Sequence, residues 1–295
     1  LLTNRLLKLE YQHSMALRNT RQSGNPSLPE RAFDVYDRTG IGGVVRKTVS
    51  YILFKNRYVG RIHHQGDKLL YNYRHYRHPC KFSDASPYKI IHVDPERIEY
   101  KLRLDDPDRD VGYFYWWDER NRVYDGPWDR QRADFLEFHN TLYDCFESHF
   151  LNSVPWAETT FIQQQFELVD RGETTWHSCS SRQDVRDRCG RLDRVWNDIT
   201  TNGYRRQAVV NDVPDWRKDF AEVMINVGRD GELLQNSDGK HRLMMAKLAG
   251  IDEIPSYVIV RHKQWQQLRN AIRNDGVDDY PTHPDLEDLT GGDEP

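Results

Sequence analysis

The sequence is poor in cysteine, and its few cysteines are not paired along the chain. Four of the 295 residues are cysteines, and no two of them stand in a CxxC spacing. This excludes a disulfide-rich secreted domain and makes a reduced compartment the simpler interpretation. The nearest approaches to a zinc site are Cys80 with His75 and His78, and Cys179 with His177. Neither has the paired short spacing that holds a tetrahedral ion, so we predict no metal site.

Long apolar runs are also missing. No stretch approaches the roughly 18 apolar residues that a membrane-spanning helix requires, and there is no signal-peptide pattern. We therefore expect a cytoplasmic protein without a transmembrane segment, with a membrane-peripheral location as the alternative. Hydrophobic residues make up only 37% of the chain, which indicates exposed arms or polar insertions around a real core.

Charge is spread unevenly, although the formal net charge is only −4. Residues 1–87 form a basic N-terminal extension, in which we expect an amphipathic helix at 1–21 and strands at 44–61. In residues 69–81, tyrosine and histidine alternate with arginine. Such a stretch can hold a nucleic-acid backbone and stack bases, or it can form a protein face rich in cation–π contacts. The helix at 1–21 can pack on the body of the protein or bind an anionic surface.

The end of the chain carries the opposite charge. Residues 275–295 contain eight acidic side chains and no lysine or arginine. We expect this acidic tail to be poorly ordered, because it has little apolar surface to bury. An alternative is that it folds against the basic extension and masks its charge.

The middle of the chain contains one predicted strand followed by several helices. Residues 88–100 read as a strand that stops at a proline turn, Asp94-Pro95. Apolar residues recur at helical spacing in 132–151, 156–168 and 182–202, and the last of these helices should end at Asn202-Gly203. The aromatic run at 113–117 is better assigned to the core than to a base-stacking platform.

Residues 222–261 hold the densest cluster of phosphate-compatible chemistry. Alternation of apolar and polar residues predicts a hairpin over 222–235 with its turn at 228–231. The next residues, 236–239, read as a glycine-containing loop that leads directly into a helix at 240–249, which Gly250 can end.

The start of this helix is unusual in its charge. Lys240, His241 and Arg242 all fall in the first turn, where cations are disfavoured by the helix dipole. A strand–loop–helix junction with glycine leaves backbone N–H groups available to an anion. Three consecutive basic residues there make sense if an anionic ligand compensates them. The alternative is that they are surface residues tolerated by solvent screening.

These residues resemble the ParB/sulfiredoxin-like superfamily. In that superfamily a strand leads into a loop of the type G-E-R-R or G-G-C-H-R, then a short helix, then G-x-x-x-I-P and another strand. The corresponding run here is DGKHR at 238–242 and GIDEIP at 250–255. Upstream, DITTNGY at 198–204 is similar to the family's segment before the hairpin, and IHVDPERI at 91–98 is similar to its first strand. The resemblance covers residues 188–262 and extends upstream to residue 88.

The resemblance implies an α+β fold with a mixed-sheet core over residues 88–274 and a largely helical insertion at about 100–185. It also implies a nucleotide or phosphate site, with ATP, ADP or CTP as the ligand together with Mg²⁺. By position, the phosphates would contact Ser237, Gly239, Lys240, His241 and Arg242. Sulfiredoxin repair needs a cysteine before the His-Arg pair, and Lys240 stands there instead. The segregation proteins carry a helix-turn-helix after this domain, whereas only one helix, at 262–274, is expected here.

Three functions follow as hypotheses. The first is a nucleotide-dependent enzyme, a phosphotransferase or NTP hydrolase, with Asp238 as the nearest candidate base and His241 stabilising charge on the phosphoryl group. Glu222 and Glu232 are alternative carboxylates. The second is a non-catalytic nucleic-acid-binding protein, or a nuclease, that uses the basic aromatic extension. The third is a structural or membrane-peripheral protein that has lost its site.

Overall fold

The computed structural model describes residues 57–102, 120–173, 175–211, 222–236, 238–276 and 279–289. Its contacts divide the chain into two compact units, Leu1–Leu70 and Tyr71–Pro295. The helix expected at 1–21, the expected strands up to residue 56, the aromatic run at 113–117 and Ser237 lie outside the described residues.

One prediction for the basic extension is wrong. Residues 57–61, expected in a strand, begin the helix α3, Arg57–Arg77. Contacts made by the second half of α3 explain why this segment is a helix. The ring of Tyr71 is buried, Arg74 lies over that ring at 5.0 Å, and His75 Nδ1 is 2.8 Å from the carbonyl oxygen of Phe82. These three side chains, at positions i, i+3 and i+4, can meet the same neighbours only on a helix.

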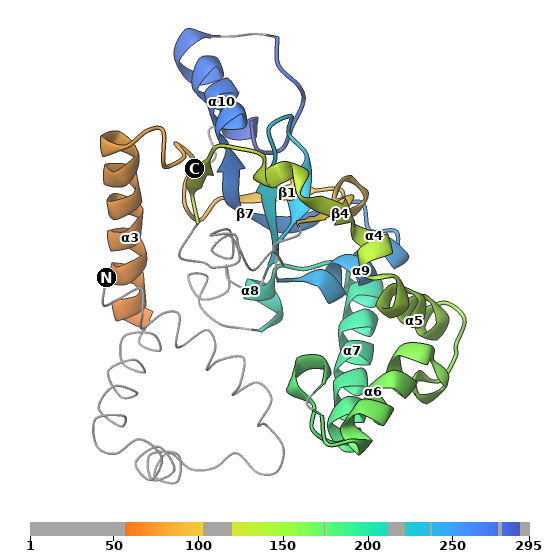
Figure 1. Ribbon diagram of the computed structural model, residues 1–295. Coiled ribbons are helices and arrows are strands. Elements are labelled where there is room, and N and C mark those ends of the chain that lie inside the picture. The colour runs from red at the N-terminus through yellow and green to blue at the C-terminus, as the bar shows by residue number, and fades with distance from the viewer. Residues whose placement is uncertain are drawn as a thin grey trace. The chain divides into compact units, whose positions relative to one another are not determined.

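Tyr71–Pro295 is built on one mixed sheet (Figure 1). Its strands are β1 Ile90–Val93, β2 Tyr100–Leu102, β3 Arg122–Tyr124, β4 Arg132–Asp134, β5 Val223–Val227, β6 Leu233–Gln235 and β7 Ile254–His262. They lie in the order β1-β7-β5-β6-β2-β4, and β3 also pairs with β7. The pairs β5–β7, β6–β2 and β3–β7 are parallel, and the others are antiparallel. The mixed sheet agrees with the expected fold class.

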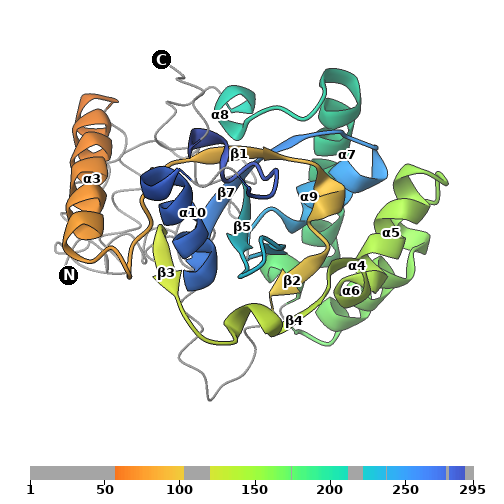
Figure 2. The same ribbon diagram turned by 90° about the horizontal axis from the view of Figure 1, so that it is seen from above.

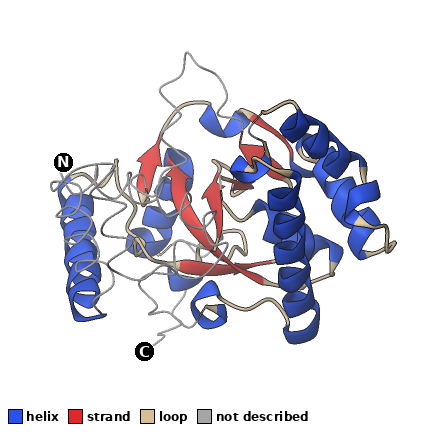
Figure 3. Ribbon diagram, turned by 90° about the horizontal axis from the view of Figure 1, so that it is seen from below, coloured by secondary structure: helices blue, strands red, loops and turns tan. Residues whose placement is uncertain are grey.

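The helices after α3 cover this sheet unevenly. They are α4 Phe135–Phe138, α5 Asn140–Phe150, α6 Thr160–Asp170, α7 Arg182–Asn202, α8 Gln207–Val210, α9 Lys240–Leu248 and α10 Lys263–Asp275. Figures 1 and 3 show α5, α6 and α7 packed as one group beside the sheet, next to α9. The helix α10 lies instead along β7 and β3 (Figure 2).

The core sits on both faces of the sheet. Successive residues of β5 alternate between two clusters, because side chains along a strand point to opposite faces. Ile225 joins the larger cluster with α9 and the helical group, and Met224 joins the smaller one with Tyr257 and Leu234. All nine residues of β7 are buried, as expected of a strand with partners on both edges.

The segment around the predicted phosphate loop folds as the sequence predicts. The antiparallel hairpin β5–β6, the helix α9 and the end of that helix before Gly250, whose φ is 61°, are confirmed. The strand β1 stops at Asp94, whose side chain accepts a hydrogen bond from the Glu96 amide at 2.8 Å. The helix α7 ends at Gly203 with φ of 72°.

The expected helical insertion needs correction. Three strands of the sheet, β2, β3 and β4, lie within residues 100–185. The helix expected at 132–151 begins only at Phe135, because β4 pairs with β2 and the Asp134 side chain caps the Glu137 amide at 2.8 Å. It then breaks at His139, whose φ and ψ are −111° and 17°.

The expectation of a poorly ordered acidic tail does not hold for residues 279–289. Leu286 is 1% exposed, and the Asp285 carboxylate lies between Arg261 and Arg269 in the interior. Asp288 pairs with Arg269 at 2.9 Å and with Lys89 at 2.7 Å. Asp285 and Asp288 thus pair with basic side chains of the folded domain. Composition alone does not reveal these partners.

Among the described residues, no helix is both long enough and apolar enough to cross a membrane.

Candidate anion-binding site

The loop before α9 depends on one glycine. Gly239 has φ of 84°, which side-chain-bearing residues rarely adopt. A Cβ there would lie 2.7 Å from the Cα of Val223, a backbone atom that cannot move aside easily. Asp238 ties the loop to the sheet, since its carbonyl oxygen accepts bonds from the Met224 amide at 3.4 Å and the Gln235 side chain at 3.2 Å. The loop therefore fixes where the first residues of α9 point.

Those first residues point in different directions, as successive positions on a helix must. Arg242 turns toward Tyr204, whose hydroxyl oxygen is 3.3 Å from Nη1, and toward Glu222 at 3.7 Å. Glu222 is buried and also accepts a bond from the Gln207 amide at 2.7 Å. Arg242 is thus engaged with a carboxylate inside the protein.

His241 points into the core of the helical group. It is 9% exposed, packs against the ring of Phe146, and its Nε2 accepts a hydrogen bond from Trp176 Nε1 at 3.3 Å. Burial, together with the neighbouring His177, Arg188 and other basic groups, lowers the pKa of His241 well below its ordinary value. The imidazole is therefore neutral at pH 7.

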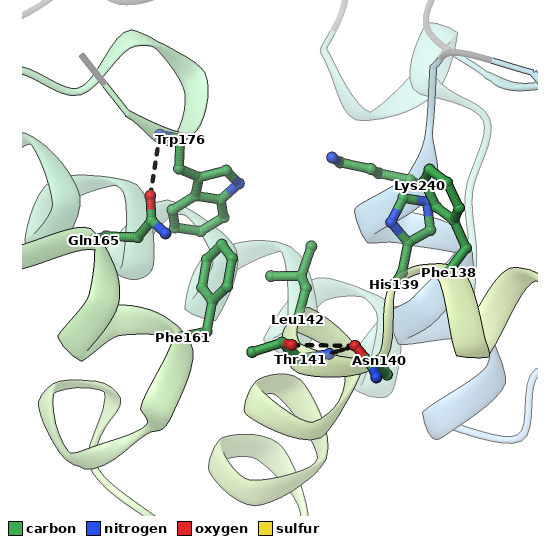
Figure 4. Close-up of a pocket in the computed structure, with 9 residues that line it drawn as sticks. All are labelled: Phe138, His139, Asn140, Thr141, Leu142, Phe161, Gln165, Trp176 and Lys240. Carbon is green, nitrogen blue, oxygen red and sulfur yellow. Dashed lines mark hydrogen bonds between the residues drawn. The ribbon is translucent and has the colours of Figure 1, made fainter. Parts of the chain in front are cut away.

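Of these three residues, Lys240 is the one whose side chain extends into a pocket, which has a volume of about 320 Å³ (Figure 4). Its walls come from α9, from the α4–α5 junction, from α6 and from the short 3-10 turn Trp176–Ser178. The lining residues are Phe138, His139, Asn140, Thr141, Leu142, Phe161, Gln165, Trp176 and Lys240. Figure 4 shows the lysine ammonium group reaching across the pocket toward Trp176. None of the nine is acidic.

Two helix N-termini meet at this pocket. Asn140, Thr141 and Leu142 are the first residues of α5, and Lys240 is the first residue of α9. Neither helix has a side-chain cap or an acidic residue in its first turn. The start of α9 therefore leaves partial positive charge on its backbone N–H groups, whereas at α5 the Thr141 amide donates to the Asn140 side-chain oxygen at 2.6 Å and the Leu142 amide to the His139 carbonyl oxygen at 3.0 Å.

The charged groups around the pocket add to this positive potential. Burial, then Lys240 and Lys101, lowers the pKa of His139 to about 4. Burial, then Arg188 and Lys240, lowers the pKa of His177 to about 3. Lys240 itself has a lowered pKa because it is buried and faces Arg188. A bound anion would relieve each of these effects.

Two polar groups of the pocket lack partners within the described part of the chain. The Lys240 ammonium group makes no hydrogen bond or ion pair with any described residue. The Nε2 atom of His139 is buried and has no hydrogen-bond partner there either. Because buried polar groups are nearly always satisfied, the His139 atom points to a ligand or bound water, and the Lys240 ammonium group, which is not fully buried, is available to the same ligand.

Most of this pocket was not predicted from the sequence. Phe138, His139 and Trp176 lie about 60 to 100 residues before Lys240 in the chain, in segments interpreted as a continuous helix and a polar loop. A weak sign was present at 138–141, where FHNT interrupts the apolar pattern of the predicted helix. Of the predicted site residues that the structure describes, Lys240 lines the pocket, whereas Asp238, Gly239, His241 and Arg242 do not. Ser237 lies outside the described residues.

No family model, curated protein or solved structure matches this chain. Functional assignment therefore rests on the side-chain geometry. Within the described residues, no group of three or more histidine, cysteine, aspartate or glutamate side chains could hold a metal ion.

Proposed function

We propose that the chain binds a phosphate-bearing small molecule, of the nucleotide class, in the pocket that Lys240 enters. One observation carries the proposal: the partly buried Lys240, without a hydrogen bond or ion pair among the described residues, enters a pocket that has no acidic lining residue and lies at the first residues of α5 and α9. Phosphate supplies both the negative charge and the several acceptor oxygens that such a place can satisfy.

The ParB/sulfiredoxin-like resemblance supports the same ligand class. The order of hairpin, glycine loop, short helix and strand agrees with it, and so does the mixed sheet. Within the motif we assign the phosphate contact to Lys240 rather than to Arg242, because Lys240 enters the pocket and Arg242 pairs with Glu222. Because no lining residue is acidic, an accompanying Mg²⁺ would be held through phosphate oxygens and water.

A thermal-shift screen tests the binding. ATP, ADP, CTP and GTP with Mg²⁺, each at millimolar concentration, should raise the melting temperature for at least one ligand. Lys240→Gln should remove that shift. Lys263→Gln is the matched control, since it removes the same charge from an exposed pair with Asp125 and should keep the shift. No shift with any ligand, or a shift that persists in Lys240→Gln, contradicts the proposal.

Catalysis is a separate step within this proposal. If the site transfers or hydrolyses the phosphoryl group, release of inorganic phosphate should depend on Lys240 and follow saturation of the pocket. Asp238→Asn tests the nearest candidate carboxylate as a base, with Glu222 and Glu232 as the alternatives. A neutral, buried His241 supports a packing role more readily than proton transfer at pH 7.

A second candidate, nucleic-acid binding, is favoured by the outer face of α3. Tyr73 and Tyr76 are 61% and 81% exposed, and Arg77 and Lys81 are exposed beside them. Exposed aromatic rings among cations can stack bases and contact phosphates. Binding of a single-stranded oligonucleotide should then weaken with salt and with Tyr76→Ala. Affinity that is indifferent to both would rule this candidate out.

A further inference from the structure

The wall of the pocket opposite Lys240 is a tryptophan whose position is fixed from several sides. The Trp176 backbone amide donates to the Gln165 side-chain oxygen at 3.2 Å, and its indole Nε1 donates to His241 Nε2 at 3.3 Å. The Phe161 ring meets the indole edge-on, with centroids 5.2 Å apart. The ring therefore keeps its position without a ligand.

The backbone beside this tryptophan is held in a costly conformation. His177 and Ser178 have φ of 53° and 61°, in the left-handed region that residues with side chains rarely adopt. Together they turn the chain so that Trp176 faces the pocket while His177 packs near His241, with ring centroids 5.0 Å apart. The surrounding contacts thus overcome local strain to present the indole.

A second aromatic ring of the pocket lies across from the first (Figure 4). Phe138 is 44% exposed, although its neighbour Phe135 is fully buried. It meets the ring of His139 edge-on at 4.8 Å. The folded protein leaves the Phe138 ring partly exposed, whereas a planar group bound in the pocket would cover that ring.

From this arrangement, and resting on the proposed phosphate site, we infer that the ligand carries a planar aromatic ring of the nucleobase type that contacts Trp176 and Phe138. The phosphate contacts the Lys240 ammonium group. Trp176 is then the specificity-determining residue, and His241 is a positioning residue that holds the indole through its Nε2. A pocket of about 320 Å³ is near the lower end of the roughly 300–1,000 Å³ seen for small-ligand sites, which favours a single nucleotide.

Paired ligands separate the ring from the phosphate. The full chain is titrated with AMP and with ribose 5-phosphate, which has the same sugar and phosphate but no base. Wild type should prefer AMP by roughly 5- to 150-fold, the range expected for contact between a base and an aromatic side chain. Trp176→Leu should reduce that preference to nearly one while leaving the affinity for ribose 5-phosphate unchanged.

Two further variants guard against a misfolded protein. Phe138→Ala changes an exposed ring and should lower the preference without affecting the fold. Trp196→Leu is the control, because Trp196 stacks on Phe150 at 4.5 Å in the same helical group but does not line the pocket. For the positioning residue, His241→Gln keeps an acceptor for the indole and should retain more of the preference than His241→Leu.

The outcomes distinguish the two proposals. Equal affinity of wild type for AMP and ribose 5-phosphate overturns this inference and leaves the phosphate site standing. This inference is also overturned if Trp176→Leu and Phe138→Ala lose affinity for AMP and for ribose 5-phosphate to the same extent. The two rings would then act only by maintaining the fold. Failure of wild type to bind either ligand overturns the proposed function and this inference together.

Discussion

Replacing Asp285 with asparagine should destabilise the protein more than the same replacement of an exposed aspartate. The Asp285 carboxylate is fully buried, and it accepts hydrogen bonds from Arg261 Nε at 2.8 Å and from Trp265 Nε1 at 3.0 Å. Arg269 approaches it to 3.6 Å and Lys89 to 3.7 Å. The substitution keeps the shape of the side chain and removes its charge.

The size of the effect follows from what the cations lose. Arg261 is 1% exposed; the amide oxygen of the new asparagine and that of Asn121, at 3.4 Å, can still accept hydrogen bonds from it, but neither carries a negative charge. Breaking a buried pair by removing one partner costs about 3–5 kcal/mol, because the remaining charge stays buried without compensation. That is a large share of the roughly 5–15 kcal/mol by which proteins of this kind are stable. The melting temperature should fall by roughly 6–20 °C.

Urea denaturation followed by circular dichroism measures the change. Asp230→Asn is the matched control, since that side chain is 64% exposed in its pair with Arg130 and should cost about 1 kcal/mol or less. A loss below about 1 kcal/mol in Asp285→Asn would refute the reasoning, because the buried pair would then be no stronger than an exposed one.

The pH dependence of the same protein provides a second readout. Burial raises the pKa of Asp285, but Arg261 and Arg269 outweigh burial and hold that pKa well below its ordinary value of 3.8. The folded state therefore keeps the carboxylate charged where the unfolded state would take up a proton. The stability contributed by Asp285 is complete above about pH 4 and is lost as the pH falls further. Asp285→Asn should lose less stability than wild type over that range.

Three other outcomes are expected. Gly239→Ala should cost about 1–3 kcal/mol in urea denaturation, because of its positive φ and the clash with Val223, whereas Gly250→Ala, which has open space, should cost less. An anion in the pocket should raise the pKa of His139 from about 4, so calorimetric affinity should rise as the pH falls from 7 to 5, and His139→Gln should flatten that rise. With a thiol reagent, native protein should show one fast thiol, Cys80, and the other three should react only after unfolding, because they are buried.

Local sequence patterns predict the elements around the loop. Alternation and turn residues predicted the β5–β6 hairpin, and the glycine positions predicted both the start of α9 and the end of α7. These features depend on interactions within a few residues, so the pattern contains what is needed to predict them. The expectation that an anion compensates the basic first turn of α9 also comes from local pattern, and it stays a prediction.

Long-range packing sets which side chains lie together at the pocket. The helix sends Lys240, His241 and Arg242 in three directions, and long-range packing sets which of them meets Glu222, the core or the pocket. The aromatic walls come from segments about 60 to 100 residues upstream of Lys240, and residues 279–289 are held by buried arginines of β7 and α10. Composition and periodicity record the local preference of each segment. They do not show which side chains another segment places against it. In this protein, such contacts between segments form the pocket and hold residues 279–289.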